Sequence, residues 1–247
     1  MELAKAANEF VDYLKDSQCT VALTGAGVST ASGIPDFRGP NGLYKRLPNN
    51  IFELEFFKNN PAKYYELTFD LVHYFDEKQP GKTHKMLAKL EKEGYLEGVI
   101  TQNIDGLHQK AGSSNVVELH GNTSRFVCMQ CGKTYSKKHL IEILKKQNPP
   151  ECSCGGLIKP DVVFFGEMLP MEALSQSEGM SLEADLFVAL GSSLVVYPAA
   201  QYPLLAKRYG SRLVIVNRGE TGLDSIADYK IDGDLEEFSQ YVIDLLE

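Results

Sequence analysis

Four of the five cysteines stand in two close pairs, Cys128 with Cys131 and Cys152 with Cys154, and twenty residues separate the pairs. Two such pairs can supply four thiolates to one tetrahedral zinc ion, and this separation is typical of a zinc ribbon. Since four protein ligands leave no position for water, we expect the metal to be structural. The sequence leaves open whether the tight Cys-x-Cys spacing of the second pair weakens or strains the site.

Two disulfides are the alternative for these thiols, but no export signal is visible, which favours the metal. Cys19 stands alone inside a predicted strand, and we interpret it as a small, buried, apolar residue.

A glycine turn follows the first predicted strand directly, at Gly25-Ala26-Gly27. Glycines there allow a close approach to a pyrophosphate, which the amides of a following helix can bind. The usual dinucleotide fingerprint has a third glycine where Thr30 stands, so the dehydrogenase pattern is not met. A tight turn without a ligand explains the glycines equally well. The next loop carries an acid, an aromatic ring and a cation that could flank a nicotinamide ribose or form a solvated loop: Asp36, Phe37 and Arg38.

Polar residues follow two further predicted strands, at Gln102-Asn103-Ile104-Asp105 and at His120. The carboxyl ends of parallel strands share one edge of a sheet, so these residues should lie beside the glycine turn. An imidazole there could act as a general base near neutral pH. Alternatively, Asn103 or Asp105 caps a helix beginning near residue 104, and His120 is structural. The other histidines are interpreted as surface or structural residues: His73, His84, His108 and His139.

Hydrophobic periodicity indicates an α/β fold whose large domain is a Rossmann-like, mostly parallel sheet covered by helices on both faces. Strands are expected at 19–24, 98–101, 116–119, 162–165, 186–190 and 213–217, and helices at 3–14, 51–58, 61–77, 82–93 and 235–246. Residues 32–50 are predicted to form a long irregular loop. Two insertions are expected to build a small helical and zinc-ribbon domain, 32–78 and 122–160, leaving 1–31, 79–121 and 161–247 as the large domain.

The chain of 247 residues has a formal net charge of −8, which argues against general nucleic-acid binding. Its longest apolar runs are too short to cross a bilayer. We therefore expect a cytoplasmic protein without membrane contacts, and a monomer.

The ordered motifs GAGVSTASGIPDFRG, TQNIDGLH, ELHG, the two cysteine pairs, FFGE and GSSL resemble the sirtuin family of NAD-dependent protein deacylases. The resemblance extends from the first strand to about residue 233. It implies a large dinucleotide-binding domain, a small zinc domain and a substrate peptide between them. It also implies NAD as a consumed co-substrate, one structural zinc ion and acetyl-lysine proteins as partners.

Site roles are implied by the same resemblance. His120 matches the general base, Asn103 the residue that positions the reacting ribose, and Val163 and Phe165 the lining of the acyl-lysine tunnel. The implied cofactor contacts are Gly25, Ala26, Thr30, Asp36, Phe37, Arg38, Gln102, Ile104, Asp105, Gly191, Ser192, Ser193, Asn217 and Asp232.

The implied reaction removes an acyl group from lysine and yields nicotinamide and O-acyl-ADP-ribose. Relatives that prefer acidic acyl groups carry a Tyr-x-x-Arg pair, whose counterpart here is Tyr65 with Thr68. Because the arginine is missing, a carboxylate would lack its bidentate partner, and acetyl or another neutral acyl group is expected.

Three other functions remain open from the sequence. A protein ADP-ribosyltransferase would use the same site, and a non-catalytic NAD- or peptide-binding module would use only its surfaces. A dehydrogenase is the weakest alternative.

Overall fold

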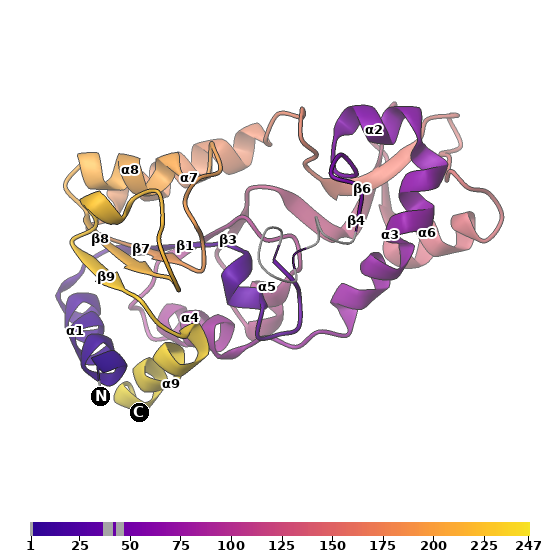
Figure 1. The fold of residues 1–247 in the computed structure, drawn as a ribbon. Helices are drawn as coiled ribbons and strands as arrows, with labels where there is room; N and C mark the ends of the chain where they lie inside the picture. Colours follow the sequence, from indigo (N-terminus) through magenta and orange to yellow (C-terminus); the bar gives the residue numbers. More distant parts are fainter. Residues whose placement is uncertain (1, 37–41, 43–46) are drawn as a thin grey trace.

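A six-stranded parallel sheet forms the larger part of the computed structural model, which describes residues 2–36, 42 and 47–247 (Figure 1). Its spatial order is β3-β2-β1-β7-β8-β9. This is the order of a doubly wound dinucleotide-binding sheet, with the change of direction between β1 and β7. The strands are β1 (Thr20–Thr24), β2 (Gly98–Thr101), β3 (Val116–Glu118), β7 (Leu186–Leu190), β8 (Arg212–Val216) and β9 (Tyr229–Ile231).

Helices cover both faces of this sheet, as predicted. Helices α1 (Glu2–Asp16), α4 (Lys82–Lys92) and α9 (Leu235–Leu245) pack on one face, and α7 (Met171–Glu183) and α8 (Gln201–Arg208) on the other (Figure 1). Successive residues of β1 alternate between the two layers: Ala22 joins the first core, and Val21 and Leu23 the second. This alternation explains why the strands are apolar throughout.

A smaller unit lies at one end of the molecule (Figure 1). It contains an antiparallel sheet of order β5-β4-β6, made of β4 (Gly121–Cys128), β5 (Thr134–Ser136) and β6 (Ile158–Val162). Helices α2 (Leu54–Asn59), α3 (Pro61–Asp76) and α6 (Lys137–Leu144) accompany it. A third buried core joins residues of both insertions, including Phe57, Tyr65, Phe126 and Ile158.

The predicted strand at 162–165 is wrong. The strand is β6, it ends at Val162, and it pairs antiparallel with β4 rather than entering the parallel sheet. Residues beyond it bridge to a different segment, where the Phe165 amide donates to the carbonyl of Phe52 at 2.8 Å. A short apolar run carries no information about its partner strand, so the pattern predicted extended structure but not its sheet.

Several element boundaries also differ from the prediction. The helix expected near residue 104 is α5 (Leu107–Ala111), and the turn after β1 is a four-residue 3-10 helix, Ala26–Ser29. Strand β9 was not predicted, because Tyr229–Ile231 is short and contains Lys230, so it is not a continuous apolar run. Part of the predicted irregular loop at 32–50 lies outside the described residues. Among the helices that the structure describes, none is both long and apolar enough to cross a membrane.

Candidate functional site

The carboxyl ends of the parallel strands lie in one row. Thr24 at the end of β1 pairs with Thr101 and with Leu190, and the row continues to Glu118, Val216 and Ile231. Most of the predicted cofactor and catalytic residues follow these strand ends within four positions: Gly25, Ala26, Gln102, Asn103, Ile104, Asp105, His120, Gly191, Ser192, Ser193, Asn217 and Asp232. The structure therefore brings them to one edge of the sheet, as expected.

The glycine turn packs against the turn that follows β7. A Cβ on Gly27 would lie 2.7 Å from the Gly191 Cα, and one on Gly25 would lie 2.8 Å from the Gly191 oxygen. Gly191 itself has φ +60°, and its added Cβ would meet the Val28 nitrogen at 2.6 Å. Contact between two backbones thus already requires glycine at all three positions.

The prediction that a helix after this turn offers free amides to phosphates needs correction. The Gly25 amide donates to the Leu190 carbonyl and the Gly27 amide to the Gly191 carbonyl, at 3.1 and 2.8 Å. These two amides are therefore used within the protein, and the following 3-10 helix has only four residues. Thr30, which replaces the third glycine, is exposed and donates its hydroxyl to the Gly27 carbonyl.

His120 is held by the backbone of the neighbouring strand end. Its Nδ1 lies 2.9 Å from the Gln102 carbonyl oxygen. A carbonyl can only accept, so Nδ1 carries the proton and Nε2 keeps its lone pair. Burial lowers the pKa of His120, and the Gln102 carbonyl opposes this shift only in part. The ring is therefore neutral at neutral pH and basic at Nε2.

Asn103 joins this cluster to the glycine turn. Its side-chain amide donates to the Gly25 carbonyl at 3.0 Å and to the Ser29 hydroxyl at 3.1 Å. Both amide protons are used, and no described residue donates to its Oδ1. Asn103 is buried, so its orientation is fixed and its oxygen is the group left for a ligand.

Ser29 is the central residue of a buried polar network that no sequence pattern predicted. Its hydroxyl donates to Asp105 at 2.7 Å and accepts from Asn103. The Nε2 of His84 lies 3.4 Å from the same hydroxyl, and the Gly81 amide donates to its Nδ1. Asp105 also accepts from the Leu107 amide at 2.9 Å, although Gly106, and not Asp105, is the N-cap of α5. Its place in the polar cluster agrees with the expected arrangement, and its contact with a cofactor stays a prediction.

The surface interpretation of His108 is wrong, whereas His84, interpreted as structural, is buried but lies within a polar cluster rather than apart from one. Both are buried, and their rings lie 4.8 Å apart. The Nε2 of His108 lies 2.9 Å from the Thr24 hydroxyl. Burial, with a smaller effect of His84, lowers the pKa of His108 to about 3. No local pattern could have identified this pair, because the two histidines lie on separate helices and only the fold brings them to Thr24 and Ser29.

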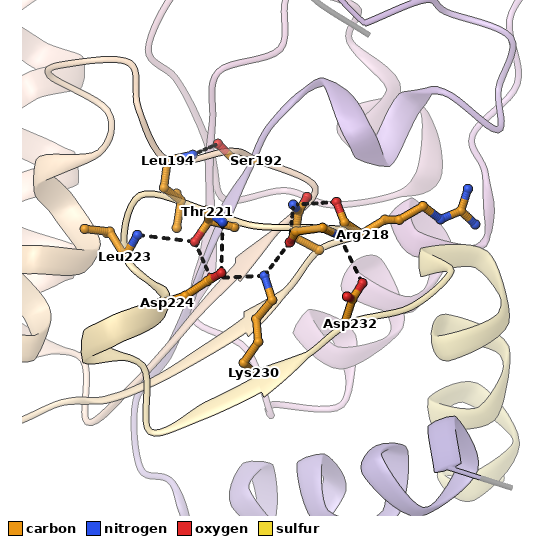
Figure 2. A network of polar contacts seen from close by, with 10 residues as sticks. Ser192, Leu194, Arg218, Thr221, Leu223, Asp224, Lys230 and Asp232 are labelled. Atoms are coloured by element: carbon orange, nitrogen blue, oxygen red, sulfur yellow. Dashed lines mark hydrogen bonds and ion pairs between the residues drawn. The ribbon is translucent and has the colours of Figure 1, made fainter. Parts of the chain in front are cut away.

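The far end of the row is a polar loop network between β8 and β9 (Figure 2). Asp232 accepts from the Gly219 amide at 3.0 Å, and Lys230 donates to the Gly219 carbonyl at 2.9 Å and to Asp224 at 3.0 Å. Asn217 donates to the Arg218 carbonyl. These contacts give residues 217–224 a defined shape beside the β7 turn.

Ser192, in the turn after β7, connects that loop network to the strand end that carries Gln102. Its hydroxyl accepts from the Gln102 side chain at 3.0 Å and from the Leu194 amide at 3.3 Å. The Ser193 carbonyl accepts from the Gly222 amide of the β8–β9 loop at 2.9 Å. Of the remaining predicted contacts, Asp36 is half-buried, whereas Phe37 and Arg38 lie outside the described residues.

The two predicted substrate residues lie on the segment that follows β6. The Val163 amide donates to the His120 carbonyl at 2.9 Å, which joins this segment directly to the site. The side chain of Phe165 is 55% exposed, so it has room to contact a ligand. Tyr65 and Thr68 are both buried, and the Tyr65 hydroxyl donates to the Ile158 carbonyl at 2.7 Å.

The four paired cysteines converge in the smaller unit. All four sulfur atoms lie within 4.8 Å of one another, with Cys128–Cys154 at 3.5 Å and Cys131–Cys152 at 3.6 Å. Tetrahedral zinc with about 2.3 Å bonds separates its sulfurs by about 3.8 Å, so the cluster fits zinc. The Cys-x-Cys turn therefore does not prevent convergence. Cys19 is half-buried, and burial raises the pKa of its thiol, in keeping with an apolar role.

A model of the Sir2 family matches residues 25–198, which is more than half of the chain. The chain belongs to the Sir2 family. The NAD-dependent protein deacetylase of Thermotoga maritima is 49% identical over 96% of both this Sir2 chain and its own. Two solved Sir2 structures have similar folds, one with a deacetylated p53 peptide and 3′-O-acetyl ADP ribose (TM-score 0.92, 48% identity) and one with a p53 peptide and NAD+ (TM-score 0.91, 47% identity). Each alignment covers 96% of this Sir2 chain and 97% of the other.

Proposed function

We propose that the chain is an NAD-dependent protein deacetylase, which removes acetyl groups from lysine side chains and yields nicotinamide and O-acyl-ADP-ribose. The observation that carries this proposal is the connected set His120, Gln102, Asn103 and Gly25 at the edge of a doubly wound sheet. The named deacetylases at nearly half identity over almost the full chain support it.

The donor set fits a nucleotide. Ligands of such sheets bind where the strand order reverses, here between β1 and β7, and Gly25 and Gly191 meet at that point. NAD, when bound, supplies a ribose carbon that accepts the acyl oxygen as nicotinamide leaves. On this proposal the nicotinamide ribose lies near Asn103 and His120, and the phosphates and adenosine near Ser192, Ser193, Asn217 and Asp232. Gly25, Ala26, Thr30, Asp36, Phe37, Arg38, Gln102, Ile104, Asp105 and Gly191 complete the proposed contacts.

The chain's own groups account for the proton transfer. His120 is neutral, has its Nδ1 proton directed at Gln102, and keeps Nε2 as the basic atom. We assign Nε2 as the acceptor of a proton from a ribose hydroxyl. Asn103, with both amide protons used, presents only an acceptor oxygen, which suits a hydroxyl group of the ribose.

We place the acyl-lysine peptide against Val163 and Phe165, since this segment is bonded to the His120 carbonyl. A neutral acyl group is preferred because Thr68 stands where an arginine would be needed to pair a carboxylate. The buried, backbone-bonded hydroxyl of Tyr65 supports this preference.

The cysteine cluster is proposed to hold one structural zinc ion. We propose a small domain of 32–78 and 122–160 and a large domain of 1–31, 79–121 and 161–247; the third core joins both insertions and also includes Phe164, just beyond the proposed boundary. Reduced thiols arranged for a metal favour a cytoplasmic protein, and we propose a monomer that binds no specific nucleic acid.

Mass spectrometry of the products from NAD and a panel of acyl-lysine peptides tests this function. We expect nicotinamide, free lysine peptide and acetyl-ADP-ribose in equal amounts with the acetylated peptide, and much less product with the succinylated one. Label from NAD attached stably to protein would instead indicate an ADP-ribosyltransferase. Absence of any product at saturating NAD and peptide would indicate a binding module, and formation of NADH would indicate a dehydrogenase.

A further inference from the structure

Among the residues whose side-chain burial the structure describes, which leaves out 70–74 and 76, Lys159 on β6 is the only buried Lys, Arg, Asp or Glu. Its Nζ lies 3.0 Å from Oε2 of Glu167, and the side chains are 8% and 22% exposed. A buried ion pair seldom stabilises a protein more than apolar residues of the same size would, because desolvation offsets the attraction. Stability alone therefore gives little reason for a charged pair at this position.

Lys159 and Glu167 together close a turn around the residues between them, 160–166. The Lys159 ammonium also donates to the Val162 carbonyl at 2.8 Å and lies 4.8 Å from the centre of the Phe164 ring. Glu167 accepts from the Phe164 amide at 2.8 Å, and its own amide donates to the Phe164 carbonyl at 2.9 Å. Gly166, at φ +92°, allows the chain to reverse.

Two other contacts fasten the enclosed segment on its outer side. The Val163 amide donates to the His120 carbonyl. Phe165 is joined to the start of α2, accepting from the Leu54 amide at 3.0 Å. The ion pair, the carbonyl of His120 and the start of α2 thus hold the backbone of residues 163–165 from three sides.

We infer that the Lys159–Glu167 ion pair is a positioning device for the acyl-lysine substrate, holding the backbone of Val163–Phe165 in its binding conformation. This inference rests on the proposed function, because the segment is assigned to the peptide there. Lys159 and Glu167 are positioning residues and need not touch NAD.

Steady-state kinetics of Glu167→Gln test this role. The amide keeps an oxygen for the Phe164 N–H but loses the ion pair. We expect the KM for an acetyl-lysine peptide to rise about tenfold, with kcat and the KM for NAD changed by less than about twofold. Lys159→Met should have the same effect, and Lys159→Arg, which keeps the charge and the donors, should restore most of the affinity.

Asp161→Asn is the matched control. It removes the ion pair of Asp161 with Arg125 on the neighbouring strand, whose side chains are 40% and 59% exposed. An exposed pair contributes little, so all three constants should stay near those of the unsubstituted protein.

An unchanged peptide KM in folded Glu167→Gln would overturn the inference, and so would equal rises in both KM values. If this variant does not fold, Glu167→Asp, which keeps the charge on a shorter side chain, is judged by the same criterion. Failure of both to fold would show a purely structural role. If the unsubstituted protein does not deacetylate the peptide, the proposed function itself is contradicted. If it is active but the peptide KM is the same in all variants, only the role of the ion pair is overturned.

Discussion

The imidazole of His120 donates to one backbone carbonyl and is partly buried. The Gln102 carbonyl fixes the tautomer, and desolvation disfavours the charged ring, so Nε2 stays available as a base. At this scale the sequence predicted the residue type and its strand end. It could not predict the tautomer, because the partner is a backbone carbonyl of a segment eighteen residues away.

The lowered pKa of His120 has a direct consequence for the pH profile. In the proposed mechanism His120 must be neutral to act as the base, so activity should be lost as pH falls through its pKa, which lies below the ordinary value of 6.5. We expect kcat/KM for the peptide to be flat from pH 8 to about 6.5 and to fall only at lower pH. A profile measured with limiting peptide checks this. An acid limb centred above 6.5 would contradict the proposed environment.

The Ser29 network shows the limit of prediction at single residues. Motif spacing identified Asn103 and Asp105, but Ser29 and His84 come from a turn and a helix with no polar pattern of their own. His84 meets the Ser29 hydroxyl only because α4 packs beside the turn that carries Ser29. A contact between residues so far apart in the chain leaves no pattern in the local sequence.

Among the elements, the turn after β1 is defined by its contact with the turn after β7. In Gly27→Ala the new Cβ would lie 2.7 Å from the backbone of Gly191. Such overpacking costs about 1–3 kcal/mol of the free energy of unfolding, and we expect NAD binding to weaken with it. Chemical denaturation and calorimetry with NAD measure both effects.

Gly179→Ala is the matched control, because Gly179 lies inside α7 and an added Cβ would meet no atom within 4 Å. Alanine in a helix interior should stabilise by about 0.5–1 kcal/mol. Equal stabilities of the two variants would contradict the proposed contact between the turns.

The cysteine cluster makes a second prediction for an element. One zinc ion per chain is expected, and a chelator should remove it with a fall in Tm and a loss of deacetylation. This follows because the free energy of binding a structural zinc ion contributes directly to the free energy of folding. Readdition of zinc should restore both. Cys19→Ser should keep the metal, whereas Cys131→Ser should lose it. A metal-free protein with unchanged Tm and activity would show that the thiols hold no structural ion.

The parallel sheet was predictable because five of its six strands are apolar runs next to turn residues. The sheet of the smaller unit was less predictable. β4 and β6 pair across residues 121–162 with a register shift, and no periodicity encodes that pairing. The apolar run at 162–165 was consequently assigned to the wrong sheet.

For the whole molecule, two buried imidazoles and one half-buried imidazole link stability to pH. Burial lowers the pKa of His84, His108 and His120, so the folded chain binds fewer protons than the unfolded chain. Their contribution is fully present above pH 6.5 and is lost as pH falls toward the folded values. Each histidine should lower the free energy of unfolding by up to about 1.4 kcal/mol per pH unit in this range.

His108→Gln isolates one of these contributions. Glutamine can still donate to Thr24, and the slope of unfolding free energy between pH 6.5 and 5 should decrease by about 1 kcal/mol per pH unit. Urea denaturation at several pH values measures it. His139→Gln, at an exposed position of α6, is the control for the loss of an imidazole at the surface. An unchanged slope in the His108 variant would contradict its burial as a neutral ring.

The proposed deacetylase activity depends most on His120 as the base beside a bound NAD, and the variant His120→Ala tests this role most directly. NAD affinity and the rate of deacetylation of an acetyl-lysine peptide are measured on the same folded sample. We predict an NAD Kd within about twofold of the unsubstituted protein and a fall in deacetylation of roughly 100-fold or more. Deacetylation that persists at a similar rate would contradict the account.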